Sequence, residues 1–201
     1  VASDSAYLDR FGKSVSISGD YVVVGAYYDD DHADSSGSAY VFERQGDGSY
    51  KQVAQLKGTD VTTDNEIGWS VEVDKHGGSV DVFVGAVGDG KNSTGAVYVY
   101  RRQNAGTYTL KQKIFAADKS YDFSWFGNAL FASGTRLVVG AMGNNAKGAV
   151  YIFEAVGNSS YKEIAKLVAS DGIISQGFGT SVAIDGLRLV VGAPAALAQN
   201  S

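Results

Sequence analysis

Apolar and polar positions recur along the chain in a repeated order, about every fifty to sixty residues. Each repeat begins with an aromatic or isoleucine residue before glycine, followed by an alternating segment such as residues 70–73. A nearly continuous apolar segment that ends in Gly-Ala comes next, as in residues 21–26. Alternation suits a half-buried strand, and a short apolar run suits a strand covered on both faces. The pattern predicts a pair of strands at the start of every repeat.

Two further phrases complete the unit. One reads Gly-Ser/Ala-Ala/Val-Tyr and occupies residues 37–42, 95–100 and 148–153. The other begins with tyrosine and occupies residues 50–56, 108–114 and 161–167, each leading to an aspartate. Taken alone, residues 161–167 have the spacing of an amphipathic helix, but residues 108–114 do not, so the register across repeats favours strands. The first two phrases occur four times and the last two only three times.

Four strands per unit, joined by turns rich in Gly, Asp, Asn and Ser, are typical of propeller blades. With these motifs in fixed order, the chain resembles the FG-GAP repeat family, which forms the blades of integrin α-subunit propellers and of secreted microbial and algal proteins. The resemblance runs from Val1 to Pro194. It implies an all-β fold of blades with four antiparallel strands, about 3.5 to 4 repeats, in an extracellular protein. It implies no activity, because one fold hosts many functions.

We expect a single repeat domain, residues 1–201, with units at about 1–60, 61–118 and 119–171 and a truncated unit at 172–201. The opening residues 1–4 match residues 168–171, so the first unit is preceded by the end of another. The last strand pair is left with an open edge, and an open edge recruits another strand unless it is blocked. Two interpretations follow: the propeller is completed head to tail by another copy, as a ring or a filament, or by further blades of a longer chain.

The repeat also predicts the core. A shared glycine should end the second strand of each unit at a point where a Cβ would clash, at Gly25, Gly85, Gly140 and Gly192. The apolar residues beside them should be almost fully buried, at Val23, Val84, Val139 and Val191.

Charge and composition narrow the classes of partner. The 201 residues include 17 basic and 22 acidic side chains, for a net charge of −5, which disfavours a nucleic-acid-binding surface. No apolar run reaches the ~20 residues of a membrane helix, so we expect no membrane insertion. The absence of cysteine excludes disulfides without defining the compartment.

Two segments resemble ligand-binding loops. Residues 85–92 differ by one residue from a phosphate-binding loop, but a strand rather than a helix is predicted after them, so we interpret them as an ordinary turn. Calcium is the alternative for the acidic residues 29–34, although the calcium loops of integrin-type repeats lie between the first and second strands. Only residues 74–81 form a longer loop there, with Asp74 and Asp81 but few further ligands. We therefore predict no cofactor and no bound metal, with calcium as the open alternative.

Few residues in the sequence suggest a catalytic site. The two histidines, His32 and His76, lie in loops of different units without a repeated serine partner. Trp69 and Trp125 both adjoin the glycine that opens a unit, and we expect them to pack between blades. A tryptophan exposed on a propeller face would instead be a platform for stacking sugars.

Asn92 and Asn158 each begin an Asn-X-Ser/Thr sequence in a predicted loop, so both are candidate N-glycosylation sites. The sequence as a whole therefore predicts a noncatalytic extracellular or cell-surface module with a structural or adhesive role. Its partners would be further blades or copies of itself, with a glycan or extracellular protein ligand as a further option. A carbohydrate-binding propeller is the alternative, and a hydrolase is a weaker one.

Overall fold

The computed structural model describes residues 2–4, 6–104, 106–118, 122–157, 160–170 and 177–195. In this part of the chain the protein is built almost entirely of antiparallel strands, arranged as three four-stranded sheets and one two-stranded sheet. Each sheet is one blade, with its strands in chain order. The predicted all-β blade architecture is confirmed.

The blades are numbered in chain order. Blade 1 comprises β1 (Ser14–Ser18), β2 (Tyr21–Ala26), β3 (Ser38–Arg44) and β4 (Tyr50–Leu56). Blade 2 comprises β5 (Ile67–His76), β6 (Ser79–Ala86), β7 (Ala96–Arg102) and β8 (Tyr108–Ile114). Blade 3 comprises β9 (Phe126–Ser133), β10 (Arg136–Ala141), β11 (Ala149–Val156) and β12 (Ser160–Leu167), with the short 3-10 turn η1 (Asn144–Ala146) between β10 and β11. Blade 4 comprises β13 (Ser181–Asp185) and β14 (Arg188–Gly192).

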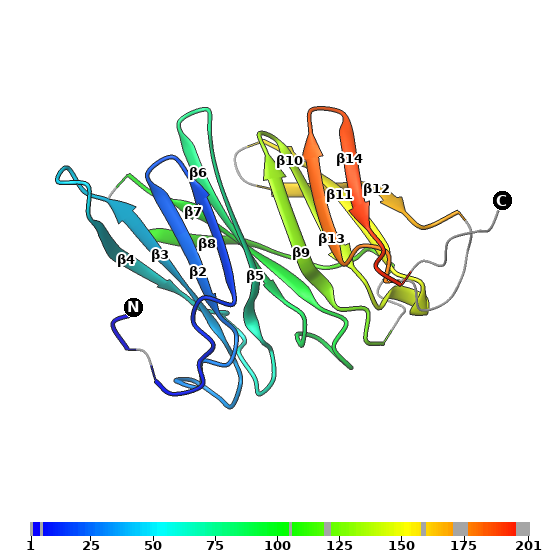
Figure 1. Ribbon diagram of the computed structural model, residues 1–201, viewed down its shortest axis with the longest axis horizontal. Helices are drawn as coiled ribbons and strands as arrows, with labels where there is room; N and C mark the ends of the chain where they lie inside the picture. Colours follow the sequence, from blue (N-terminus) through cyan, green and yellow to red (C-terminus); the bar gives the residue numbers. More distant parts are fainter. Residues whose placement is uncertain are drawn as a thin grey trace.

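The blades follow one another across Figure 1, from blade 1 in blue and cyan to blade 4 in orange and red. Their first strands are neighbours, since β1 contacts β5, β5 contacts β9 and β9 contacts β13. Blades 1 and 4 lie at opposite ends of an open array, as expected for an incomplete propeller. Among the described residues, no helix is long and apolar enough to cross a membrane.

The repeat register decides the one ambiguous segment. Strand β12 covers the residues whose spacing alone would suit a helix, and Tyr161 pairs with Ala155 of β11. A bulge follows Ile152 of β11, and the same bulge follows Val41 of β3 and Val99 of β7. Because pairing to the preceding strand satisfies the backbone groups, tertiary context overrides the local helical spacing.

The core consists of layers between successive blades. We call the side of a blade that turns toward the preceding blade its leading face, and the opposite side its trailing face. Between blades 1 and 2, Val23 and Val41 of the trailing face form one buried cluster with Val73 and Val82 of the next leading face. The same arrangement recurs between blades 2 and 3, where Phe83 lies in the cluster. The apolar second strands β6 and β10 are thus covered on both faces, because a blade lies on each side of them.

The glycine prediction holds for the first three blades. A Cβ on Gly25, Gly85 or Gly140 would overlap a backbone carbonyl oxygen of the following blade. On Gly192 it would meet only Ser181 of its own blade. The equivalent close approach therefore requires a following blade.

The burial prediction is right for Val23, Val84 and Val139, which are fully buried, and wrong for Val191, which is only partly buried. In blades 1 to 3, a third strand lies beside the second strand and shields it, as β3 shields β2. The described part of blade 4 has no such strand, so Val191 retains solvent exposure.

Candidate functional site

A tyrosine hydroxyl in the third strand of each complete blade is held by two acidic or amide side chains. In blade 2, the Tyr98 hydroxyl lies 2.6 Å from the Asp89 carboxylate and 3.2 Å from Asp60. Asp89 comes from the loop after β6, and Asp60 comes from the segment after the last strand of blade 1. Lys113 completes the cluster through ion pairs to both aspartates, at 2.7 Å and 2.9 Å. The cluster joins two blades.

Equivalent residues form the same cluster in the neighbouring blades. In blade 3, Tyr151 donates a hydrogen bond to Asp118 at 2.8 Å and accepts one from Asn144 at 2.9 Å. In blade 1, Tyr40 donates to Asp29 at 2.7 Å and accepts a hydrogen bond from Gln55 at 2.9 Å. Burial and, to a smaller extent, the nearby Asp4 raise the pKa of the Tyr40 hydroxyl. Asp4 therefore lies where the end of a preceding unit lies in the other blades, as its sequence match to residues 168–171 indicated.

These contacts explain the acidic residue at the start of the 29–34 segment. Asp29 is buried and accepts hydrogen bonds from Ser38 and Tyr40. Burial opposes its ionisation, but these hydrogen bonds prevail and lower the pKa of Asp29 below its ordinary value. Burial and hydrogen bonding to Asp29 raise the pKa of the Tyr40 hydroxyl. Asp29 thus has a structural role in which its charge is already compensated.

The second candidate calcium segment, residues 74–81, lies within the β5–β6 hairpin. The Asp74 carboxylate lies 2.9 Å from His76 Nδ1, and Asp81 is fully buried against the Arg101 guanidinium. Within the described ranges, no group of three or more Asp, Glu or His side chains is arranged to hold a metal. The other histidine, His32, is exposed in blade 1, so the two histidines are separated as the sequence suggested.

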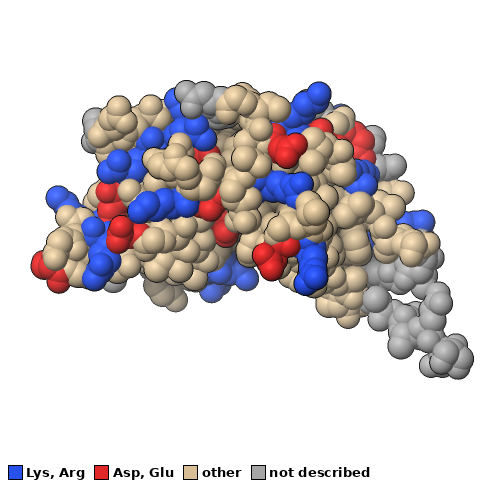
Figure 2. All heavy atoms as spheres, turned by 90° about the horizontal axis from the view of Figure 1, so that it is seen from above, with Lys and Arg blue, Asp and Glu red and all other residues tan. Residues whose placement is uncertain are grey.

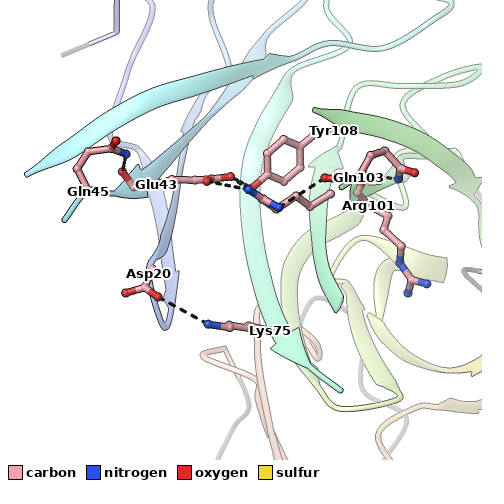
Figure 3. A network of polar contacts seen from close by, with 8 residues as sticks. Asp20, Glu43, Gln45, Lys75, Arg101, Gln103 and Tyr108 are labelled. Carbon is pink, nitrogen blue, oxygen red and sulfur yellow. Dashed lines mark hydrogen bonds and ion pairs between the residues drawn. The ribbon is translucent and has the colours of Figure 1, made fainter. Parts of the chain in front are cut away.

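Charged side chains also connect blades 1 and 2 on their outer strands (Figure 3). Arg102 donates to Glu43 at 2.7 Å and 3.1 Å, and Tyr108 donates to the same carboxylate. The hydrogen bond from Arg102 is the main cause that lowers the pKa of Glu43. Lys75 pairs with Asp20 at 3.6 Å across the inner hairpins. On the face seen in Figure 2, basic and acidic side chains are interspersed in the same way.

The remaining candidate is an aromatic pocket of about 440 Å³ that opens at one end of blades 1 to 3. Both tryptophans of the chain line it, together with tyrosine, phenylalanine and acidic side chains. We call it the aromatic pocket; its lining includes Tyr27, Tyr28, Asp64, Glu66, Trp69, Phe123 and Trp125. The sequence had identified the two tryptophans, but not that they meet at one site.

The geometry of the aromatic pocket comes from the loops that precede β5 and β9. The Trp69 ring packs edge-to-face on Tyr27 of blade 1, with centroids 5.0 Å apart. Trp125 remains 38% exposed, so it does not simply fill the space between blades as predicted. Burial, followed by repulsion from Asp64, raises the pKa of Glu66. The pocket therefore combines ring faces with a carboxylate that is poorly stabilised in its charged form.

The two candidate glycosylation sites differ in what the structure describes. Asn92 is exposed in the β6–β7 loop, with a φ of 53°. Asn158 lies outside the described residues. Strand β7 follows the 85–92 segment, so no helix N-terminus stands there to receive a phosphate.

The sequence model of the FG-GAP repeat matches residues 1–42, 108–153 and 161–201, which together make up more than half of the chain. The chain belongs to the FG-GAP repeat family. This FG-GAP chain also contains blade 2, which lies largely outside the matched ranges and has Ile67 where the other blades have phenylalanine. No curated protein shows a significant sequence match to the chain.

Proposed function

We propose that this FG-GAP chain is a noncatalytic extracellular module with a structural and adhesive role, and that its blade arrays join end to end. The observation that carries the proposal is that apolar residues on the outer faces of blades 1 and 4 are exposed, although their counterparts inside the array are buried. The extracellular location is supported by the two glycosylation sequences, of which Asn92 is exposed.

The first open surface is the leading face of blade 1. Val15 and Ile17 of β1 are 66% and 65% exposed. Their counterparts in blade 2, Val71 and Val73, are 6% and 2% exposed because they face blade 1. Two exposed β-branched side chains on the same face of an inner strand form a surface that favours association.

The second open surface is the trailing face of blade 4. Val190 of β14 is 70% exposed, whereas its counterparts Val23, Phe83 and Val138 are fully buried against a following blade. Ala183 of β13 is exposed on the same side. Ser181, Asp185 and Arg188 are exposed on the same side, so Val190 and Ala183 form an apolar centre between polar residues.

Together the two surfaces are the two halves of an interface that already occurs three times within the chain. We assign a second copy as the occupant: blade 4 of one copy covers blade 1 of the next. Such a contact joins different surfaces on the two copies, so it propagates as a ring or a filament.

Cysteine crosslinking tests this arrangement directly, because the native chain has no cysteine. In blades 1 and 2, Val73 N donates to Ser16 Oγ at 3.1 Å, so these two positions are close. At the proposed contact, Ala183 of blade 4 corresponds to Ser16, and Ile17 of blade 1 corresponds to Val73. The variant Ala183→Cys/Ile17→Cys should form a ladder of disulfide-linked multimers, while the control Ala183→Cys/Ile164→Cys should not. A crosslinked yield no higher than that of the control would contradict the proposal.

A second function, carbohydrate binding, is favoured by the aromatic pocket. Exposed tryptophan rings stack well on sugar rings, and the pocket volume suits a small ligand. Titration with neutral and amino-sugar oligomers tests this function. The absence of binding by every oligomer, with the intact protein, would exclude it.

A further inference from the structure

The composition of the aromatic pocket is not imposed by the repeat. Asp64 and Glu66 of blade 2 correspond to Leu8 and Arg10 of blade 1. In blade 3 the same two positions are occupied by aromatic residues, Phe123 and Trp125. The acidic pair and the aromatic pair are therefore features of this one site, where loops of neighbouring blades meet.

The aromatic residues of blade 3 are held in a backbone conformation that bulky side chains rarely adopt. Phe123 and Trp125 have φ values of 55° and 52°, in the left-handed region. Phe123 is also 60% exposed, so burial of its ring does not compensate for this conformation. The equivalent Asp64 and Glu66 have similar φ values of 60° and 55°, so the repeat sets this backbone and the side chains alone distinguish the site.

The lining of the aromatic pocket is acidic. Asp64 and Glu66 are its carboxylic acids, and the described lining residues include no lysine, arginine or histidine. Lys13 stands near the site, with Nζ 5.7 Å from the centroid of the Trp69 ring. Burial and the neighbouring Asp64 disfavour the charged form of Glu66, so a cation placed beside Glu66 would relieve that penalty.

We propose that the aromatic pocket binds a sugar that carries a free amine, with the sugar ring stacked on an indole and the ammonium group directed to Glu66 and Asp64. This inference rests on the second proposed function and specifies its ligand. An acidic sugar would be repelled by the two carboxylates, and a neutral sugar would leave the Glu66 charge uncompensated. An ammonium group forms charge-assisted hydrogen bonds with a carboxylate and is attracted to aromatic faces.

The test compares two oligosaccharides with the same backbone, a tetramer of glucosamine and a tetramer of N-acetylglucosamine, at pH 6. Because both tryptophans line the pocket, tryptophan fluorescence excited selectively over that of the tyrosines reports on this site. We expect the glucosamine tetramer to bind about tenfold more tightly, the ratio expected for one added charge-assisted contact. Glu66→Gln should reduce this preference, because one of the two carboxylates that face the ammonium group is lost.

Two further variants separate the roles of ring and charge. Trp125→Ala should weaken binding of both tetramers, because the stacking surface is lost. Asp47→Asn removes an exposed acid in the β3–β4 turn, outside the pocket, and should change neither affinity. Equal affinity for the two tetramers would overturn the amine inference and leave carbohydrate binding standing. Failure of both tetramers to bind the folded protein would overturn both.

Discussion

Ile17 of β1 and Ile184 of β13 occupy the same register position in their blades, yet Ile17 is 65% exposed and Ile184 only 8% exposed. The difference arises from the neighbouring blade, since blade 3 covers Ile184, whereas no described blade covers Ile17. Burying the side chain of an isoleucine contributes about 1.5–3 kcal/mol. Burial of Ile17 against another blade would therefore favour association by a free energy of this size.

The tyrosine clusters between blades should contribute measurably to stability. Tyr98→Phe removes the hydroxyl 2.6 Å from Asp89 and leaves a buried carboxylate without that partner. We expect a loss of about 1–3 kcal/mol in the free energy of unfolding, measured by urea denaturation. Tyr7→Phe, at a side chain that is 92% exposed, is the matched control and should have almost no effect. Equal stability of the two variants would exclude a stabilising role for the cluster.

Close approach of successive blades should make the shared glycine intolerant of a side chain. In Gly85→Ala, the new methyl group would overlap the Gly127 carbonyl oxygen, so the blades must separate. We expect destabilisation of about 3 kcal/mol or more, near the upper range for overpacking. Gly46→Ala meets no atom within 4 Å and serves as the control. A melting temperature unchanged by Gly85→Ala would show that the blades are less closely packed than described.

The pH dependence of stability should contain a contribution from Glu72. Burial, more than any other cause, raises the pKa of Glu72 to about 7, above its ordinary value of 4.5. The folded protein therefore binds a proton that the unfolded chain has lost, and stability falls as pH rises from about 4.5 to 7. The loss is up to roughly 3 kcal/mol. Glu72→Gln should show a smaller decrease over this interval in denaturation experiments. Parallel profiles for the two proteins would contradict a raised pKa of the partly buried Glu72.

Glycosylation tests the extracellular assignment. Produced in a eukaryotic secretory host, the chain should carry a glycan on Asn92, because this side chain is exposed in a loop. Mass spectrometry should show the loss of one glycan in Asn92→Gln, and the same comparison applies to Asn158→Gln. Secreted protein with both asparagines unmodified would contradict this prediction.

The repeated motifs made the strands, the blade order and most of the core predictable, because equivalent positions face equivalent neighbours. Val191 departed from this rule because its burial depends on a strand that is not among the described residues. Asp29 resembled a calcium ligand in sequence, but its hydrogen bonds to Tyr40 and Ser38 became evident only in three dimensions.

The aromatic pocket was not predictable as a site. Its residues come from separate blades, and no short sequence motif places Tyr27, Glu66 and Trp125 together. The one available signal was the occurrence of both tryptophans beside the opening of a unit. Their convergence depends on how the loops of neighbouring blades pack, which periodicity does not specify.

End-to-end association of blade arrays is the central claim, and sedimentation velocity over a range of protein concentrations tests it most directly. The native chain should sediment as species larger than one copy, with the population of larger species increasing with concentration. Ile17→Lys should shift it to the monomer, because a buried unpaired charge opposes the contact. Ile164→Lys, at an isoleucine that is 51% exposed on β12, should leave the distribution unchanged. A native chain that remains monomeric at every concentration would contradict the claim.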